Sequence, residues 1–151
     1  MTTIHIVRSF ISAESVAEIV AAEYDCPAPV SAKLFTKLLR TQDNDHYLVK
    51  TGDGKQYAFR LYQQGDRYRR AESDYLYEIE WLNFLQERGL PVSYPISRRD
   101  GGYVGSLDAP EGTRYYAMFS LAHGTPLSLH DPEQLYTMGE MMARIHVASN
   151  K

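Results

Sequence analysis

Cysteine is nearly absent from this chain of 151 residues, in which Cys26 is the single example. No internal disulfide can therefore form, and non-covalent contacts have to hold the fold together. A reducing, cytoplasmic location is expected on this ground. The sequence around Cys26 shows no partner base that would activate its thiol, so we interpret this residue as chemically inert.

Long apolar runs and a strong charge of one sign are absent too. No run approaches the roughly 20 apolar residues that cross a bilayer, and the N-terminus lacks the basic start and apolar segment of a signal peptide. The formal net charge is −3, which gives no overall attraction to nucleic acid or to an anionic membrane. We therefore expect neither as a partner. The 5 histidines are scattered without the spacing of metal ligands, so no metal site is predicted.

The composition that is present is that of an ordinary globular domain, with 44% hydrophobic and 23% charged residues. A chain of this length can bury a substantial core. Helical patterns alternate with short strands that are joined by tight turns, which favours an antiparallel sheet. The sequence thus predicts an α+β fold, with about five strands and a helix packed on one face of the sheet, rather than a doubly wound fold.

The boundaries of the elements follow from capping residues and turn signals. Ser12 can cap an N-terminal helix, which Pro27 would end, and Asp131 with Pro132 strongly predicts the start of a final helix. A central helix is predicted at residues 75–86, and strands at 30–39, 47–51, 56–62, 92–97, 103–107 and 114–121. Turns are predicted at 52–55, 100–102 and 109–112. In the polar break before residue 47 we interpret Asp43 and Asp45 as turn formers rather than metal ligands.

One strand and one helix carry the residues that suggest chemistry. The strand at 56–62 contains Arg60, and the helix at 75–86 carries Glu78. A cation on a strand and a carboxylate on the following helix can form an ion pair that holds the phosphates of a nucleotide. An ordinary surface pair of little energetic value is the alternative. Glu80, two residues along on a different face of the helix, is the competing carboxylate.

Three further motifs have simpler interpretations. The glycines around Asp53 suggest part of a phosphate-binding loop, but their place between two strands predicts a hairpin turn. A basic loop is predicted to be a solvated surface, and a methionine cluster is predicted to pack against another lobe or a second copy, not against a cofactor. The loop contains Arg67, Arg69 and Arg70, and the cluster contains Met138, Met141 and Met142.

The order of these segments resembles the small lobe of a protein kinase. Tyr57-Ala58-Phe59-Arg60 matches the kinase V-A-I-K pattern, with arginine in place of lysine. With this strand, the segments at 44–49, 77–82, 89–96, 116–124 and 138–146 are similar to the aminoglycoside phosphotransferase family, which includes choline-kinase-like and homoserine-kinase-like enzymes. The resemblance covers residues 10–148. The order and spacing of these segments, more than any single motif, indicate this family.

The resemblance implies roles for residues that would hold the phosphates of ATP. Arg60 would neutralise the α- and β-phosphates, where a guanidinium binds as well as an ammonium. Glu78 would orient Arg60 from the helix, and a polar loop near Asn44 would fold over the phosphates. The loop has no G-x-G-x-x-G glycine pattern, which is usual for this family.

The resemblance also implies how the adenine would be held. Ala58 would roof the ring, at a position that needs a small side chain. Backbone groups near Ser120 and Leu121, in the connector between the two lobes, would hydrogen-bond its edge. Residues 1–30 are then an N-terminal helical extension, 31–121 the nucleotide-binding small lobe, and 122–151 the hinge and first helix of a truncated large lobe.

The departure with the largest consequence concerns the catalytic loop. The family form His-Gly-Asp-x-His-x-x-Asn appears nowhere in this chain, and phosphoryl transfer needs its base and its Mg²⁺ ligands. We therefore expect ATP binding without catalysis, and Mg²⁺ only with the absent large lobe. That lobe, or a second copy of the chain, is expected to cover the helix at 135–145. The alternative is a stand-alone binding or regulatory module that pairs with a separate kinase lobe or with itself.

Overall fold

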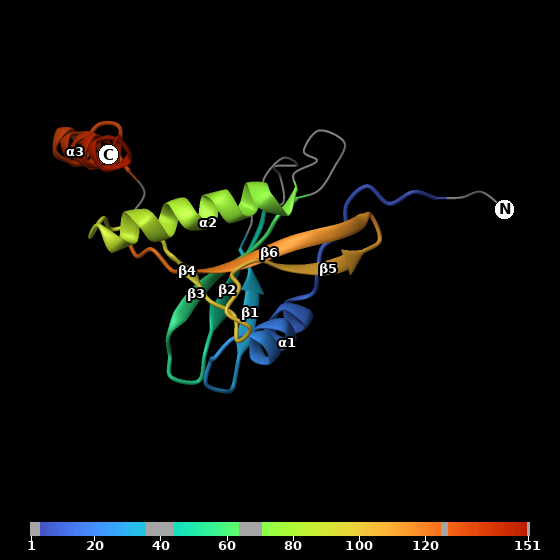
Figure 1. The fold of residues 1–151 in the computed structure, drawn as a ribbon. Helices are drawn as coiled ribbons and strands as arrows, with labels where there is room; N and C mark the ends of the chain where they lie inside the picture. Colours follow the sequence, from blue (N-terminus) through green and yellow to red (C-terminus); the bar gives the residue numbers. More distant parts are fainter. Residues whose placement is uncertain (1–3, 36–43, 64–70, 125–126, 151) are drawn as a thin grey trace.

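The computed structural model describes residues 4–35, 44–63, 71–124 and 127–150. Within these ranges the chain forms three helices and one six-stranded sheet (Figure 1). In chain order the elements are α1 (Ala13–Glu23), β1 (Ser31–Leu34), β2 (Asp45–Lys50), β3 (Gln56–Leu61), α2 (Glu72–Glu87), β4 (Pro95–Ile96), β5 (Gly105–Ala109), β6 (Gly112–Ser120) and α3 (Pro132–Ser149).

The sheet is antiparallel throughout, which confirms the predicted α+β class. Its strands follow the order β1-β2-β3-β6-β4, and β5 pairs with the remaining length of β6. The predicted hairpin at residues 100–102 is wrong in its pairing, because β4 and β5 both pair with β6 and not with each other. A turn does form there, with the Gly102 carbonyl accepting from the Arg98 N–H at 2.7 Å.

The β2–β3 hairpin fixes which residues lie beside Arg60. Its turn is closed by the Thr51 N–H, which donates to the Lys55 carbonyl at 3.1 Å. Gly54 lies at φ 81°, a backbone region that glycine adopts without strain. The resulting register sets Arg60 opposite His46, and β6 on the other side sets it opposite Ala117. The hairpin prediction for residues 52–55 is thus confirmed.

The two faces of the sheet carry different helices, and α1 and α2 lie on opposite sides of it (Figure 1). On the α1 side, Val16 and Val20 pack with strand residues such as Phe59 in one buried cluster. On the other side, Tyr75 and Ile79 of α2 pack with buried residues of the sheet. The prediction that the central helix packs on one face is confirmed, and the N-terminal helix shares in the core from the other face.

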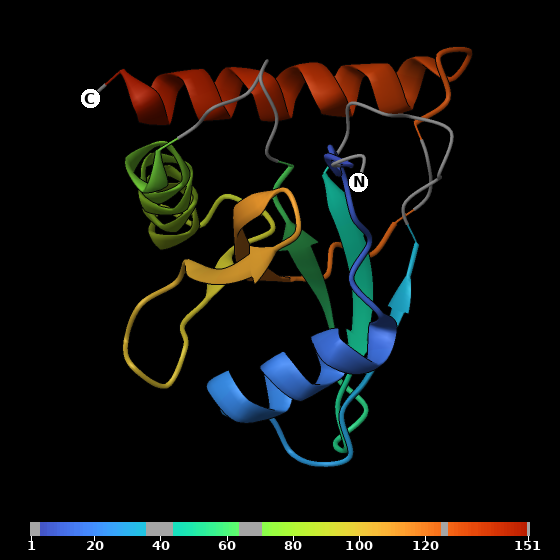
Figure 2. The same cartoon turned by 90° about the vertical axis from the view of Figure 1, so that its right-hand side faces the viewer.

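Helix α3 differs from the other two helices because none of its residues is buried. It begins as predicted, with the Asp131 side chain accepting from the N–H groups of Glu133 and Gln134. In Figure 2 it runs across the α2 side of the molecule. A hydrogen bond of 3.4 Å joins Trp81 Nε1 on α2 to Ser149 Oγ on α3. Among the described residues, no helix combines the length and the apolar character needed to cross a membrane.

Candidate functional site

Arg60 lies on the central strand β3, on the face of the sheet that α2 partly covers. Because side chains alternate along a strand, Ala58, Arg60 and Tyr62 share this face, while Phe59 and Leu61 point into the α1 core. The cross-strand partners His46 and Leu48 lie on the same face. We call these four half-buried residues, His46, Leu48, Ala58 and Arg60, the Arg60 face.

The predicted ion pair is present. Arg60 Nη1 lies 2.5 Å from Glu78 Oε1, and the two side chains are 27% and 32% exposed. Glu80 is exposed and lines a hollow toward α3 with Tyr77 and Trp81. The carboxylate at Arg60 is therefore that of Glu78, because the helix turns Glu80 to another side.

Aromatic rings fix the position of this pair. The Arg60 guanidinium carbon lies 4.7 Å from the centre of the Phe119 ring and 5.8 Å from that of Tyr62. The Tyr62 hydroxyl donates to Glu78 Oε2 at 3.3 Å. Neither aromatic residue was predicted from the sequence to belong to the site. Tyr62 could have been found, since it follows Arg60 by two positions on one strand face, whereas the contact with Phe119 depends on a strand register that the sequence does not state.

The Arg60 guanidinium retains one polar group without a partner. Its Nε is buried, and no described residue accepts a hydrogen bond from it. A buried donor without an acceptor costs about 1–3 kcal/mol, whereas a half-exposed ion pair by itself contributes about 0–1 kcal/mol. The Arg60 side chain as a whole is still 27% exposed, and a guanidinium that is held in place with an exposed part is suited to bind an anion such as a phosphate.

Ala58 lies between two apolar neighbours next to this cation. Its cross-strand partners are Leu48 on β2 and Phe119 on β6. Both Leu48 and Ala58 are only half-buried. The small alanine side chain leaves a shallow apolar surface beside the charge, which is a suitable arrangement for a flat ring that carries phosphates.

Asn44 directly precedes β2, and its side chain links the start of β2 to the end of β3, the strand that carries Arg60. Its Oδ1 accepts a hydrogen bond of 3.0 Å from the Gln63 backbone N–H, just after β3. Residues 36–43, which include the end of the predicted strand at 30–39 and most of the polar break with Asp43, lie outside the described ranges, as does the basic loop with Arg67, Arg69 and Arg70. The contact of Asn44 thus fixes one end of the chain segment that we expect over the phosphates.

Ser120 ends β6, and its polar groups are engaged with the chain before β4. Its backbone N–H donates to the Tyr94 carbonyl at 2.8 Å, and its carbonyl accepts from Ser93 Oγ. Its hydroxyl oxygen accepts from the Tyr94 N–H at 3.0 Å. The coil that follows begins with the half-buried Leu121.

A second ion cluster, also missed from the sequence, lies on the α1 side of the sheet. Asp45 Oδ2 accepts from Arg114 Nη2 at 2.8 Å, and the two side chains are 0% and 1% exposed. Arg8 Nη2 lies 2.6 Å from the other oxygen of Asp45. The interpretation of Asp45 as a turn former is wrong, because it is a buried strand residue whose partner lies 69 positions away in the chain.

Other candidate groups give no catalytic centre. In the part of the chain that the structure describes, no group of three or more His, Cys, Asp or Glu side chains could hold a metal ion. Burial, followed by the negative charge of Asp53, raises the pKa of the Cys26 thiol, which lowers its reactivity.

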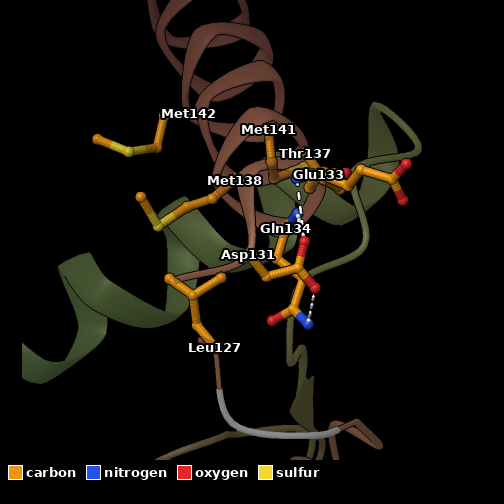
Figure 3. A pocket seen from close by; sticks show the side chains of 8 residues that line it. All are labelled: Leu127, Asp131, Glu133, Gln134, Thr137, Met138, Met141 and Met142. Carbon is orange, nitrogen blue, oxygen red and sulfur yellow. Dashed lines mark hydrogen bonds between the residues drawn. The ribbon is translucent and has the colours of Figure 1, made fainter. Parts of the chain in front are cut away.

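The methionine cluster borders an open groove beside the first turns of α3 (Figure 3). The groove has a volume of about 720 Å³. Figure 3 shows Leu127, Met138 and Met142 extending to the same side of the helix. Met138 and Met142 are 41% and 50% exposed, so they form an apolar surface that the described residues leave open to solvent.

Known proteins provide the comparison for this geometry. The chain is 33% identical to an uncharacterized protein of Synechocystis over 96% of its own length and 38% of the relative. It is 28% identical to a homoserine kinase of Methylobacillus glycogenes over 70% of its own length and 30% of that enzyme. The chain thus spans well under half the length of these curated relatives.

Solved structures show the same fold. An amicoumacin kinase in complex with AMP-PNP, Ca²⁺ and Ami matches 89% of this chain and 39% of its own, with a TM-score of 0.69 and 20% identity. A microcompartment-associated aminopropanol kinase matches 88% of this chain and 39% of its own, with a TM-score of 0.63 and 23% identity. These likenesses confirm the kinase-like small lobe predicted from the sequence. The sequence model of the phosphotransferase enzyme family matches residues 35–151, and the chain therefore belongs to that family.

Proposed function

We propose that this chain is the ATP-binding small lobe of a phosphotransferase that acts on an alcohol group of a small molecule. Arg60 binds the α- and β-phosphates, and Glu78 orients its guanidinium. Asn44 holds the end of the loop that covers the phosphates. The observation that carries this proposal is the Arg60–Glu78 ion pair on a half-open sheet face, where the two side chains are still 27% and 32% exposed.

The adenine is proposed to bind beside this pair, against the apolar part of the Arg60 face. Ala58 roofs the ring, with Leu48 as its neighbour on β2. Hydrogen bonds to the base edge come from the connector at Ser120 and Leu121. The Ser120 backbone already bonds to Ser93 and Tyr94. We therefore assign the hydrogen bonds to the base mainly to Leu121 and the residues after it. The amicoumacin kinase that was solved with AMP-PNP supports a nucleotide at this kind of fold.

Phosphoryl transfer itself is not proposed for this chain alone. Transfer would need Mg²⁺ to neutralise charge on the phosphates and a base to accept the alcohol proton. In this family the sequence His-Gly-Asp-x-His-x-x-Asn supplies these groups, and it is not present here. The residues of this chain bind and orient the nucleotide, and a large lobe supplies the catalytic groups and the acceptor site.

Helix α3 is proposed to be the surface that meets this large lobe. None of its residues is buried, and the solved neighbours are more than twice as long as this chain, which matches 39% of each. The alternative partner is a second copy of the chain. Sedimentation velocity of the chain at micromolar concentration separates these cases, because self-association gives a fraction of dimer that increases with the concentration of the chain.

The direct test is to measure ATP binding by the chain. NMR titration suits this measurement, because it determines dissociation constants in the millimolar range. Arg60→Ala should weaken ATP binding at least tenfold and leave adenosine binding unchanged, because only ATP offers phosphates. Arg99→Ala is the matched control, since it removes the same charge from an exposed arginine paired with Asp25 on the other side of the sheet. Equal ATP affinity for wild type and Arg60→Ala would remove Arg60 from the phosphate role.

A further inference from the structure

The Tyr62 side chain lies beside both members of the Arg60–Glu78 pair. Tyr62 is 1% exposed and follows directly after β3, where its backbone N–H extends the ladder by donating to the Tyr115 carbonyl at 2.9 Å. Its side chain therefore points to the same side of the sheet as Arg60, two residues earlier. A buried residue anchored in this way has little freedom to move.

The Tyr62 hydroxyl gives Glu78 a second point of attachment. Glu78 Oε1 accepts from Arg60 Nη1 at 2.5 Å, and Oε2 accepts from Tyr62 at 3.3 Å. With one donor on each oxygen, the carboxylate cannot rotate about its last bond without losing a hydrogen bond. Burial, followed by the negative charge of Glu78, raises the pKa of the Tyr62 hydroxyl, so it stays a proton donor at neutral pH.

The Tyr62 ring also joins the helix to the strand. Its centre lies 4.2 Å from that of Tyr75, near the start of α2, and Tyr75 in turn lies 5.3 Å from Tyr115 on β6. Aromatic pairs at such separations contribute beyond their buried area. These contacts hold α2, which carries Glu78, at a fixed place relative to β3, which carries Arg60.

We propose that Tyr62 is a positioning residue, which holds Glu78 and through it the Arg60 guanidinium in the orientation that receives nucleotide phosphates. This inference rests on the proposed function. Without the hydroxyl, Glu78 rotates, and Arg60 is held mainly by the ring of Phe119, 4.7 Å away. The cation then samples several orientations, and the phosphates have to select one of them.

The test compares Tyr62→Phe with Tyr115→Phe. The first variant removes only the Tyr62 hydroxyl that donates to Glu78 and keeps the ring beside Tyr75. The second removes a hydroxyl from the same aromatic cluster, and no described contact joins Tyr115 to Glu78 or Arg60. In Tyr62→Phe the NMR order parameter of the Arg60 Nε–H bond should fall by roughly 0.2, which is the gap between rigid and flexible groups. Tyr115→Phe should leave it unchanged.

Nucleotide binding gives the second readout. Tyr62→Phe should weaken ATP binding about 3- to 10-fold, as the loss of one hydrogen bond predicts, while adenosine binding stays the same. In an Arg60→Ala background the same change should have no further effect. A loss of general packing would instead weaken both ligands and persist in that background, which would overturn the proposal.

The outcomes separate this inference from the proposed function. If Arg60→Ala weakens ATP binding but Tyr62→Phe changes neither the order parameter nor the ATP affinity, the positioning role is wrong and the phosphate site stands. If the wild-type chain does not distinguish ATP from adenosine, the proposed function is wrong. In that case a fall in the Arg60 order parameter would support Tyr62 as the group that positions Arg60, and an unchanged value would refute this.

Discussion

The two faces of the sheet have opposite characters, although the same strands build both. On the α1 side the strand residues are fully buried, with Tyr47, Val49 and Phe59 at 0% exposure. On the Arg60 face their direct neighbours in sequence, His46, Leu48 and Ala58, are half-buried. The α1 side therefore holds the larger of the two buried clusters, and the Arg60 face, next to the smaller cluster under α2, keeps a surface on which a ligand can bind. Four substitutions test this division.

The largest loss of stability is expected from Phe59→Ala on the α1 side. The Phe59 ring contacts those of Tyr47 and Tyr116 at centre distances of 6.4 and 5.1 Å, so its removal leaves a cavity in the core. We expect the free energy of unfolding to fall by about 3–5 kcal/mol, measured by urea denaturation. A loss below about 1 kcal/mol would show that this side does not form the main core.

Asp45→Ala should be nearly as damaging, by about 3 kcal/mol, because the buried Arg114 loses its nearer carboxylate and keeps the more distant one of Glu111, at 3.5 Å. The measurement is again urea denaturation, with the exposed pair Arg99–Asp25 as a control. Asp25→Ala should change the unfolding free energy by no more than about 0.5 kcal/mol. Equal effects of the two substitutions would mean that Arg114 and Asp45 are solvated.

Ala58→Leu is the sharpest contrast with Phe59→Ala, since the two positions are adjacent on β3. The larger side chain projects onto the half-open Arg60 face, so the unfolding free energy should change by about 1 kcal/mol or less. Adenosine binding should weaken roughly tenfold, because the roof of the proposed ring site is filled. Titration with adenosine measures this, and unchanged adenosine binding would move the base elsewhere.

The smallest effect on stability is expected from Met142→Lys on α3. Met142 is 50% exposed and contributes to no buried cluster, so the unfolding free energy should stay within about 0.5 kcal/mol. Sedimentation velocity of the same variant tests the partner of this surface. If the wild-type chain dimerises and Met142→Lys does not, a second copy covers the groove of Figure 3.

Local patterns in the sequence were sufficient for much of the fold. The turn glycines predicted the β2–β3 hairpin, the caps at Ser12 and Asp131 predicted two helix starts, and strand alternation put Arg60 and Ala58 on one face. These features depend on residues within a few positions of each other, and short-range sterics and hydrogen bonds decide them. The pairing of β4 and β5 was mispredicted because a turn between two strands does not state that those strands are neighbours.

The sequence by itself determined the class of fold, the family resemblance, and the two charged residues that form the ion pair. The tertiary structure alone decided that Tyr62 and Phe119 hold the pair, and that Asp45 is buried against Arg114. The reason is physical. Each of these contacts joins residues that are distant along the chain or on separate elements, so it exists only after the strands are in register and α2 is packed on the sheet.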